Sequence, residues 1–308
     1  MSARPTFPPR GTRRTALAAS LAAAGVLAAC SPLALLDRTV PGDTHVFKGD
    51  IAYGADARQK LDVFRPLPDR LPAFGARPLV VFFYGGTWSA GDRADFRFVA
   101  EALASAGAVV VLPDYRLSPR VVYPAFVRDS ALAVKWAIDH AVELGADPAQ
   151  IYVMGHSSGA YNAAMVALDA RWLGELGASP AQLAGWIGMA GPYDFLPIEN
   201  PRAQVAFDWP RTPASSQPMN HVSPRSPRAL LLAATKDDIV DPVRNTRRMA
   251  EHLASAGVPV ETRYFDDLGH LTLIGAVARS LRWIGGPVLP PILEFLRLPP
   301  TPRPGTPR

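Results

Sequence analysis

The chain has 308 residues, of which 48% are hydrophobic and 19% charged, so its composition is that of a globular protein with a sizeable core. The formal net charge is +5, but four arginines and no acidic residue stand in the first 14 positions. Without these arginines the net charge is about +1, and no Lys/Arg-rich cluster with interleaved aromatic residues follows, so the sequence does not indicate a nucleic-acid-binding surface. The single cysteine, Cys30, excludes a disulfide within the chain.

The first 29 residues predict an export signal. Residues 1–14 are polar and basic, residues 15–29 form an apolar Ala/Leu/Val run, and the run ends in Leu27-Ala28-Ala29-Cys30. This order is typical of a cleaved secretory signal, and the apolar run is too short to favour a permanent membrane span. Leu-Ala-Ala-Cys resembles the bacterial lipobox, so Cys30 is expected to be the lipidated first residue of the mature protein. The alternative is an incidental cysteine at the end of an ordinary signal peptide.

The lipobox resemblance implies a protein exported and lipid-anchored to the bacterial cell envelope, at the periplasmic face or in the outer membrane. Residues 30–44 then predict a tether, and the proline-rich residues 299–308 predict a disordered tail. Residues 45–298 are left as a single domain without internal repeats. Within this domain, residues 195–227 form a long, irregular and proline-rich segment, which indicates either a small cap over the site or a surface excursion.

Apolar runs typical of buried strands alternate with helix-like segments along this domain. The predicted strands cover residues 60–64 (an edge strand), 79–84, 108–113, 151–154, 186–190, 229–234 and 260–265. The predicted helices cover residues 95–106, 126–144, a segment opening at 160, 242–256 and the closing region 271–296. This alternation predicts an α/β fold with a mostly parallel, doubly wound sheet flanked by helices. In such sheets the chemistry gathers at the carboxyl ends of the strands.

A G-x-S-x-G sequence, Gly155-His156-Ser157-Ser158-Gly159, joins the strand at 151–154 to the following helix. In this context the pattern predicts a nucleophile elbow, in which a strained turn presents the serine hydroxyl above the sheet. Glycines on both sides leave room for the tight turn. The pentapeptide alone is a weak signal, because a Gly-Ser turn between a strand and a helix has the same sequence.

Gly85-Gly86-Thr87-Trp88 follows the strand at 79–84. A serine that attacks a carbonyl group creates an oxyanion, which needs preorganised N–H donors. The N–H groups of Gly86, Thr87 and Ser158 are therefore predicted to form an oxyanion hole, and Trp88 to line the mouth of a substrate pocket. The alternative for the two glycines is a tight loop without a catalytic role.

Several aspartates follow strands and compete as the carboxylate that orients a histidine. Asp237 is the predicted one because Val240 follows it in a D-x-x-V pattern, and Asp238 is the alternative. Asp241 before a proline is predicted to cap a helix. Asp114 is interpreted as structural, in a buried ion pair with Arg116 that holds its loop.

His270 stands on a glycine turn after the last predicted strand, from which its ring can reach back over the sheet as a general base. The other five histidines lie in the tether region, in helices, in an irregular segment or, for His156, on another side of the elbow. The chain order Ser157, Asp237, His270 is the serine–acid–histidine order of α/β-hydrolases. Three residues that each follow a predicted strand are a more specific signal than the pentapeptide.

From about residue 59 to 285 the chain resembles bacterial α/β-hydrolases of the esterase/lipase superfamily. The nearest group contains hormone-sensitive-lipase-type carboxylesterases, kynurenine formamidases and isoprenylcysteine methylesterases. The resemblance rests on residues 85–88, 114–119, 155–159, 191–194 and the neighbourhoods of Asp237 and His270. One departure is Tyr84, which stands where the family's His-Gly-Gly motif has histidine, and this puts the local geometry of the oxyanion loop in question.

The resemblance implies hydrolysis of small-molecule carboxylic esters with short to medium acyl or aryl groups, through an acyl-enzyme and without metal or organic cofactor. An arylformamidase or another amidase would use the same three residues. A prolyl-oligopeptidase-type peptidase would need a propeller domain for which the chain has no room. A non-catalytic binding lipoprotein on the same fold would normally have lost one of the three residues, and all are present.

Overall fold

The computed structural model describes residues 32–68, 77–284 and 286–299 of the chain. The predicted signal peptide, the predicted lipidation site at Cys30 and all but the first residue of the predicted tail lie outside these ranges. Within them, no helix combines the length and the apolar character needed to cross a membrane.

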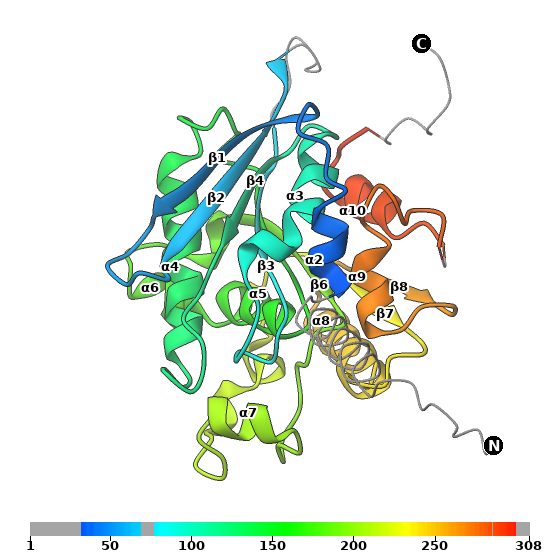
Figure 1. Ribbon diagram of the computed structural model, residues 1–308. Helices are drawn as coiled ribbons and strands as arrows, with labels where there is room; N and C mark the ends of the chain where they lie inside the picture. Colours follow the sequence, from blue (N-terminus) through cyan, green and yellow to red (C-terminus); the bar gives the residue numbers. More distant parts are fainter. Residues whose placement is uncertain (1–31, 69–76, 285, 300–308) are drawn as a thin grey trace, which may run out of the picture.

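Eight strands form one sheet in the spatial order β1-β2-β4-β3-β5-β6-β7-β8 (Figure 1). β1 pairs antiparallel with β2 and β2 with β4, whereas all later neighbours are parallel. The strands are β1 His45–Ala52, β2 Lys60–Pro66, β3 Leu79–Phe83, β4 Val109–Pro113, β5 Ile151–His156, β6 Leu183–Met189, β7 Ala229–Ala234 and β8 Val260–Phe265. The mostly parallel α/β sheet predicted from the sequence is therefore confirmed.

Helices flank the sheet on the crossovers between its parallel strands (Figure 1). The α-helices are α2 Pro32–Asp37, α3 Arg97–Ala104, α4 Ala125–His140, α5 Ser158–Leu168, α6 Ala170–Gly174, α7 Pro201–Ala206, α8 Arg248–Ser255, α9 His270–Gly275 and α10 Leu289–Phe295. Every residue of β3, β4, β5 and β7 is buried, as expected for central strands covered on both faces. The helix α5, which follows β5, is also buried along its whole length. This packed centre fixes the loops that follow the strands.

The beginning of the domain differs from the prediction. β2 is not an edge strand, because β1 pairs along it and takes the edge. β1 reads HVFKGDIA and is half-exposed, so it lacks the apolar run that reveals a buried strand in a sequence. Part of the predicted tether also folds, because Leu33 on α2 is buried in the core cluster.

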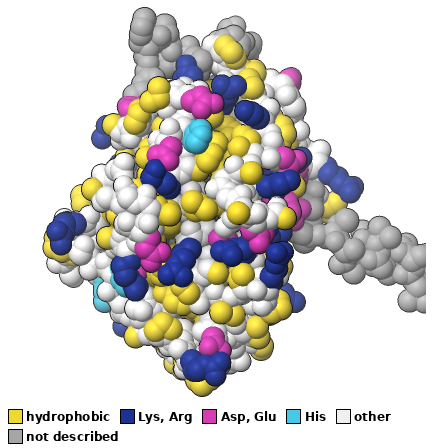
Figure 2. All heavy atoms as spheres, turned by 90° about the vertical axis from the view of Figure 1, so that its left-hand side faces the viewer, with side chains coloured by type: hydrophobic (Ala, Val, Ile, Leu, Met, Phe, Trp, Pro, Cys, Tyr) yellow, Lys and Arg dark blue, Asp and Glu magenta, His cyan; other side chains and the backbone are white. Residues whose placement is uncertain are grey.

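The surface carries charges of both signs. On the face shown in Figure 2, basic and acidic side chains are interspersed and no extended patch has a single sign. This distribution agrees with the small net charge expected once the basic leader is set aside.

Candidate active site

Ser157 occupies a strained turn between β5 and α5, with φ 55° and ψ −126°. A Cβ atom on Gly155 would lie 2.2 Å from the carbonyl oxygen of Gly159, and one on Gly159 would lie 2.1 Å from the carbonyl oxygen of Phe83. No side chain fits at either position, which explains why glycine flanks the serine on both sides. The main-chain N–H of Ser157 donates to the carbonyl of Met189 at 2.9 Å, so the turn is tied to the neighbouring strand β6.

Ser157, His270 and Asp237 lie in one hydrogen-bonded row. His270 Nε2 is 2.8 Å from Ser157 Oγ, and His270 Nδ1 is 2.8 Å from Asp237 Oδ2. The side chains of His270 and Asp237 are 5% and 1% exposed, so water competes little for these bonds. The structure thus brings together the three residues that the sequence predicts at the ends of β5, β7 and β8.

The second oxygen of Asp237 accepts the main-chain N–H groups of Ile239 and Val240, each at 2.9 Å. Burial opposes ionisation, but the hydrogen bonds from His270 and these two amides outweigh it and hold the pKa of Asp237 below its ordinary value. Asp238, the alternative acid, is exposed. Asp241 accepts the amides of residues 243 and 244 at 2.7 and 3.0 Å, as a helix cap does.

His156 contacts His270, and this contact was not predicted from the sequence. Its Nε2 is 3.0 Å from the main-chain carbonyl oxygen of His270, and the two ring centroids are 4.8 Å apart. Burial, and then the nearby His270, lower the pKa of His156 to about 3, so its ring is neutral at ordinary pH. The carbonyl needs a donor, so Nε2 carries the proton. Adjacency to the serine was the only sign of this role in the sequence.

The loop after β3 contains the predicted oxyanion donors. Gly86 has φ +144°, Thr87 has φ 53°, and a Cβ atom on Gly85 would lie 2.8 Å from Ser157 Cβ. In the part of the chain that the structure describes, the N–H groups of Gly86 and Thr87 donate no hydrogen bond. Ser158 is the first residue of α5, where an amide has no intrahelical acceptor. Among the described residues, three N–H groups beside Ser157 therefore have no acceptor, and they lie at the positive end of a helix dipole.

Tyr84 replaces the usual histidine and supports this loop through a buried network. Its hydroxyl donates to Asp114 at 2.6 Å and accepts from Arg58 at 2.8 Å, and its ring stacks between those of Phe96 and Tyr115. Asp114 is structural, as predicted. Its partner is not the expected Arg116, which binds Asp129 instead at 2.7 Å.

Asp114 instead pairs with Arg93, whose guanidinium also donates to Asp62 at 2.9 Å. The main-chain N–H of Arg93 donates to Asp114 at 3.0 Å. Asp114 therefore ties the end of β4 to residues 84–93, which include the predicted oxyanion donors. The Asp-x-Arg spacing could not show this, because these cations come from elsewhere in the chain.

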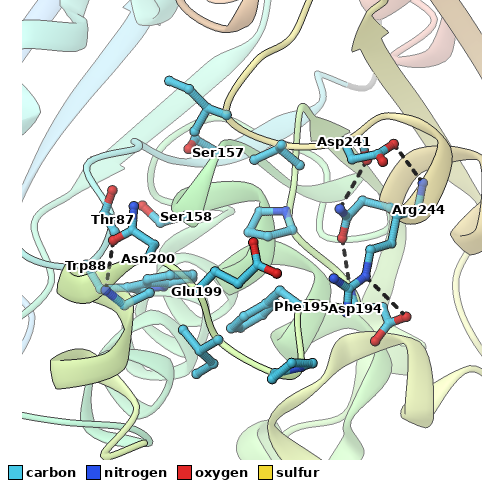
Figure 3. A pocket seen from close by; sticks show the side chains of 17 residues that line it. Thr87, Trp88, Ser157, Ser158, Asp194, Phe195, Glu199, Asn200, Asp241 and Arg244 are labelled. Atoms are coloured by element: carbon cyan, nitrogen blue, oxygen red, sulfur yellow. Dashed lines mark hydrogen bonds and ion pairs between the residues drawn. The ribbon is translucent and has the colours of Figure 1, made fainter.

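Two cavities border Ser157. The cap-side cavity, of about 220 Å³, lies between the oxyanion loop and residues 192–203, and Figure 3 shows its lining. The α2-side cavity, of about 280 Å³, lies between Gly85, His270 and Leu33. Thr87 and Ser157 line both, so the two cavities meet at Ser157.

The first part of the segment 195–227 borders the site. Phe195, Ile198 and Ala203 line the cap-side cavity, and α7 projects below the sheet (Figure 1). Trp88 also lines this cavity but is only 3% exposed, so it forms part of the wall and not the mouth that the sequence suggested. Its ring contacts four others with centroids 4.7 to 5.8 Å away, those of Phe126, Tyr161, Phe195 and Phe207. Trp88 therefore joins the segment that contains Phe195 and Phe207 to the core.

Comparison with known proteins finds one family model and several relatives that are named as esterases. The BD-FAE family model matches residues 61–253, which end before β8 and His270. Esterase LipI of Mycobacterium tuberculosis is 31% identical over 223 residues, covering 66% of this chain and 68% of its own. A probable isoprenylcysteine alpha-carbonyl methylesterase of Arabidopsis thaliana is 26% identical over 246 residues, covering 72% of this chain and 50% of its own. Carboxylesterase NlhH of M. tuberculosis is 45% identical over 98 residues, covering 32% of this chain and 31% of its own.

The chain thus spans half or less of the length of the last two relatives. Among solved structures, a thermophilic esterase from Thermogutta terrifontis superposes with a TM-score of 0.65 at 24% identity, covering 85% of this chain and 98% of its own. A thermostable esterase from Pseudomonas putida has a TM-score of 0.60 at 25% identity, covering 83% and 86%. The predicted resemblance is confirmed: this chain belongs to the BD-FAE family, an α/β-hydrolase esterase family.

Proposed function

We propose that the protein is a carboxylic ester hydrolase with Ser157 as nucleophile, His270 as general base and Asp237 as the carboxylate that orients the histidine. The observation that carries this proposal is the hydrogen-bonded row of Asp237, His270 and Ser157, with 2.8 Å at each link. The esterase names of its relatives support the same chemistry.

In the first half of the reaction, His270 Nε2 takes the proton of the Ser157 hydroxyl while Oγ attacks the ester carbonyl. The imidazole becomes positively charged, and the Asp237 carboxylate stabilises it. Because the pKa of Asp237 is held below its ordinary value, this carboxylate is ionised at neutral pH. The carbonyl oxygen of the tetrahedral intermediate takes hydrogen bonds from the free N–H groups of Gly86, Thr87 and Ser158.

In the second half, the intermediate collapses and the alcohol leaves with the proton that His270 donates. Water, deprotonated by the same histidine, then attacks the acyl carbon of the acyl-enzyme. His270 returns this proton to Ser157 Oγ as the bond to the acyl group breaks and the acid is released. Two cavities of about 220 and 280 Å³ meet at the serine, and these volumes suit short or medium acyl and aryl groups. The proposed substrates are therefore small-molecule esters of this size.

The test is hydrolysis of p-nitrophenyl esters from acetate to palmitate by the protein and by its Ser157→Ala variant. We expect turnover of the shorter esters and a loss on the order of a millionfold in the variant, because the nucleophile is gone. A folded protein without turnover of any ester would refute the proposal. Turnover of N-formyl aromatic amides in that case would identify an arylformamidase on the same residues, and failure on both substrates would indicate a non-catalytic binding lipoprotein.

We further propose that Cys30 is lipidated and holds the enzyme at the cell envelope. The support is the Leu27-Ala28-Ala29-Cys30 sequence behind a basic and then apolar leader. Expression in bacteria fed a radiolabelled fatty acid should label the protein and place it in the membrane fraction. The Cys30→Ser variant should carry no label, and equal labelling of both proteins would refute the proposal.

A further inference from the structure

The cap-side cavity has an aromatic wall. Trp88 and Phe195 both line it, with their rings stacked at an interplanar angle of 26° and a centroid distance of 5.8 Å. Trp88 is fixed by a hydrogen bond from its Nε1 to Asn162 Oδ1 at 3.1 Å. Trp88 is only 3% exposed and stacks on Phe126 as well, so the half-buried Phe195 presents the aromatic surface that a ligand can reach. Aromatic faces attract cations through the ring quadrupole.

Four charged residues also line this cavity, and three of them already form ion pairs or hydrogen bonds within the protein. Asp194 pairs with Arg248 at 3.1 Å and with Arg244 at 3.8 Å. The Arg244 guanidinium also donates to the carbonyl of Leu196 at 2.5 Å. Asp241 accepts the two main-chain N–H groups of the helical turn that follows it.

The fourth charged residue, Glu199, is exposed and forms no hydrogen bond or ion pair with any part of the chain that the structure describes. In Figure 3 its carboxylate extends into the middle of the pocket, near Phe195, and no interaction reaches it. The lining therefore offers an incoming group one unused negative charge beside an aromatic wall. A carboxylate near an accessible aromatic ring is a combination that favours a positively charged ligand.

We propose that the cap-side cavity selects an ester arm that carries a positive charge, a quaternary ammonium or a protonated amine, and disfavours an anionic arm. The inference deepens the proposed esterase function and rests on it, because the same cavity is lined by Ser157. Glu199 is the specificity-determining residue, and it acts on the substrate arm and not on the reacting bond. A neutral arm of the same shape should fall between the two charged ones.

The size of the preference follows from the exposure of Glu199. A charge pair a few ångströms apart near a protein surface is partly screened, so we expect kcat/KM for the cationic ester to exceed that of its neutral isostere about 3- to 10-fold at low ionic strength. The ratio should fall towards one in 0.5 M salt, because the Debye length then becomes shorter than the distance across the cavity and the salt screens the charge of Glu199 from the substrate. A contact made only through shape would not depend on salt.

The experiment uses two ester series, because the charged arm can be the alcohol or the acyl group. In the first, acetylcholine, its neutral isostere 3,3-dimethylbutyl acetate and an anionic acetate ester of glycolic acid are compared by pH-stat titration. In the second, p-nitrophenyl esters of 4-(trimethylammonio)butanoic acid, 5,5-dimethylhexanoic acid and glutaric acid are compared. We expect the cationic member to be favoured in at least one series, with the anionic member the poorest.

Glu199→Gln should abolish this preference and Glu199→Lys should reverse it. Each ratio is taken within one variant, so a general change in activity cancels. Glu143→Lys, at an exposed position after α4, makes the same change in net charge away from the site and should leave the ratio as in the unmodified protein. An anionic preference, which Arg244 would produce, or equal rates for all charges in both series, would overturn the inference. Turnover of the neutral esters shows separately whether the esterase function holds.

Discussion

The imidazole of His156 lies 3.0 Å from the main-chain carbonyl oxygen of His270, so one histidine holds the backbone of the other. The ring of His156 is buried and neutral, and its Nδ1 has no hydrogen-bond partner among the described residues. Among the described residues, the only hydrogen bond of this ring is therefore the one to the main-chain carbonyl of His270, the proposed general base. We interpret His156 as a positioning residue for His270.

His156→Leu should lower kcat about 10-fold with little change in KM, because the carbonyl of His270 loses a donor worth about 1–3 kcal/mol when it is buried. His156→Gln, which can keep a donor at a similar distance, should recover part of the loss. Steady-state kinetics on a short p-nitrophenyl ester would measure both effects. Equal losses in the two variants would show that the ring acts by its volume and not by its hydrogen bond.

The same residue should make stability depend on pH. The pKa of His156 is about 3 in the folded protein and about 6.5 when unfolded, so between these values the unfolded chain binds more protons. The free energy of unfolding should therefore fall as the pH drops from 6.5 towards 3, by up to about 1.4 kcal/mol per pH unit from this group. Urea unfolding at several pH values would show a shallower slope in His156→Gln, and an unchanged slope would contradict the assignment.

Asp237 should be far more important for activity than its neighbour. Asp237→Asn should lower kcat by about 10³- to 10⁴-fold, because an amide holds the histidine in the wrong tautomer and cannot stabilise its charge. Asp238→Asn removes the same charge one residue away, at an exposed position, and should change kcat less than 3-fold or so. Large losses in both variants, or in Asp238→Asn alone, would mean that the acid is misassigned.

The residues that could be placed from the sequence are those that follow strands with strong apolar runs. Ser157, Asp237 and His270 come after β5, β7 and β8, and parallel strands bring their carboxyl ends to one edge of the sheet. The prediction of a buried strand therefore also predicts where the following side chain lies. The prediction that Asp237, and not Asp238, orients the histidine rested on the D-x-x-V spacing. In the structure this spacing corresponds to the main-chain N–H of Val240 donating to Asp237.

What the sequence did not reveal depends on contacts between distant segments. The pairing of Asp114 with Arg93 and Arg58, the contact of His156 with His270 and the burial of Leu33 on α2 each join parts of the chain that periodicity cannot relate. Propensity and spacing report local structure, whereas these partners are chosen by tertiary packing.

Tyr84→Phe should destabilise the protein by about 1–3 kcal/mol, because the Tyr84 hydroxyl bridges Arg58 and Asp114 in a buried site and both would lose a partner. The free energy of unfolding from urea titration would measure this. Activity should fall in parallel, because the network ends on the loop that contains Gly86 and Thr87. Full stability in the variant would show that water replaces the hydroxyl. Tyr115→Phe serves as the matched control, because its hydroxyl donates to the carbonyl of Tyr84, at 2.8 Å, and to no charged group.

Gly86→Ala should reduce kcat by about 10²- to 10³-fold, the cost of losing oxyanion donors. The physical reason is steric: a Cβ atom at φ +144° would lie 2.1 Å from the main-chain carbonyl oxygen of Ala90, so the loop must move and carry the amides of residues 86 and 87 away from Ser157. Gly174→Ala makes the same change at an exposed helix end where the added Cβ meets nothing within 4 Å, and kcat should stay as in the unmodified protein. KM should rise less than kcat falls in Gly86→Ala, because the lost bonds form mainly in the transition state. If Gly86→Ala instead raised KM and left kcat unchanged, the loop would bind the substrate without stabilising the oxyanion.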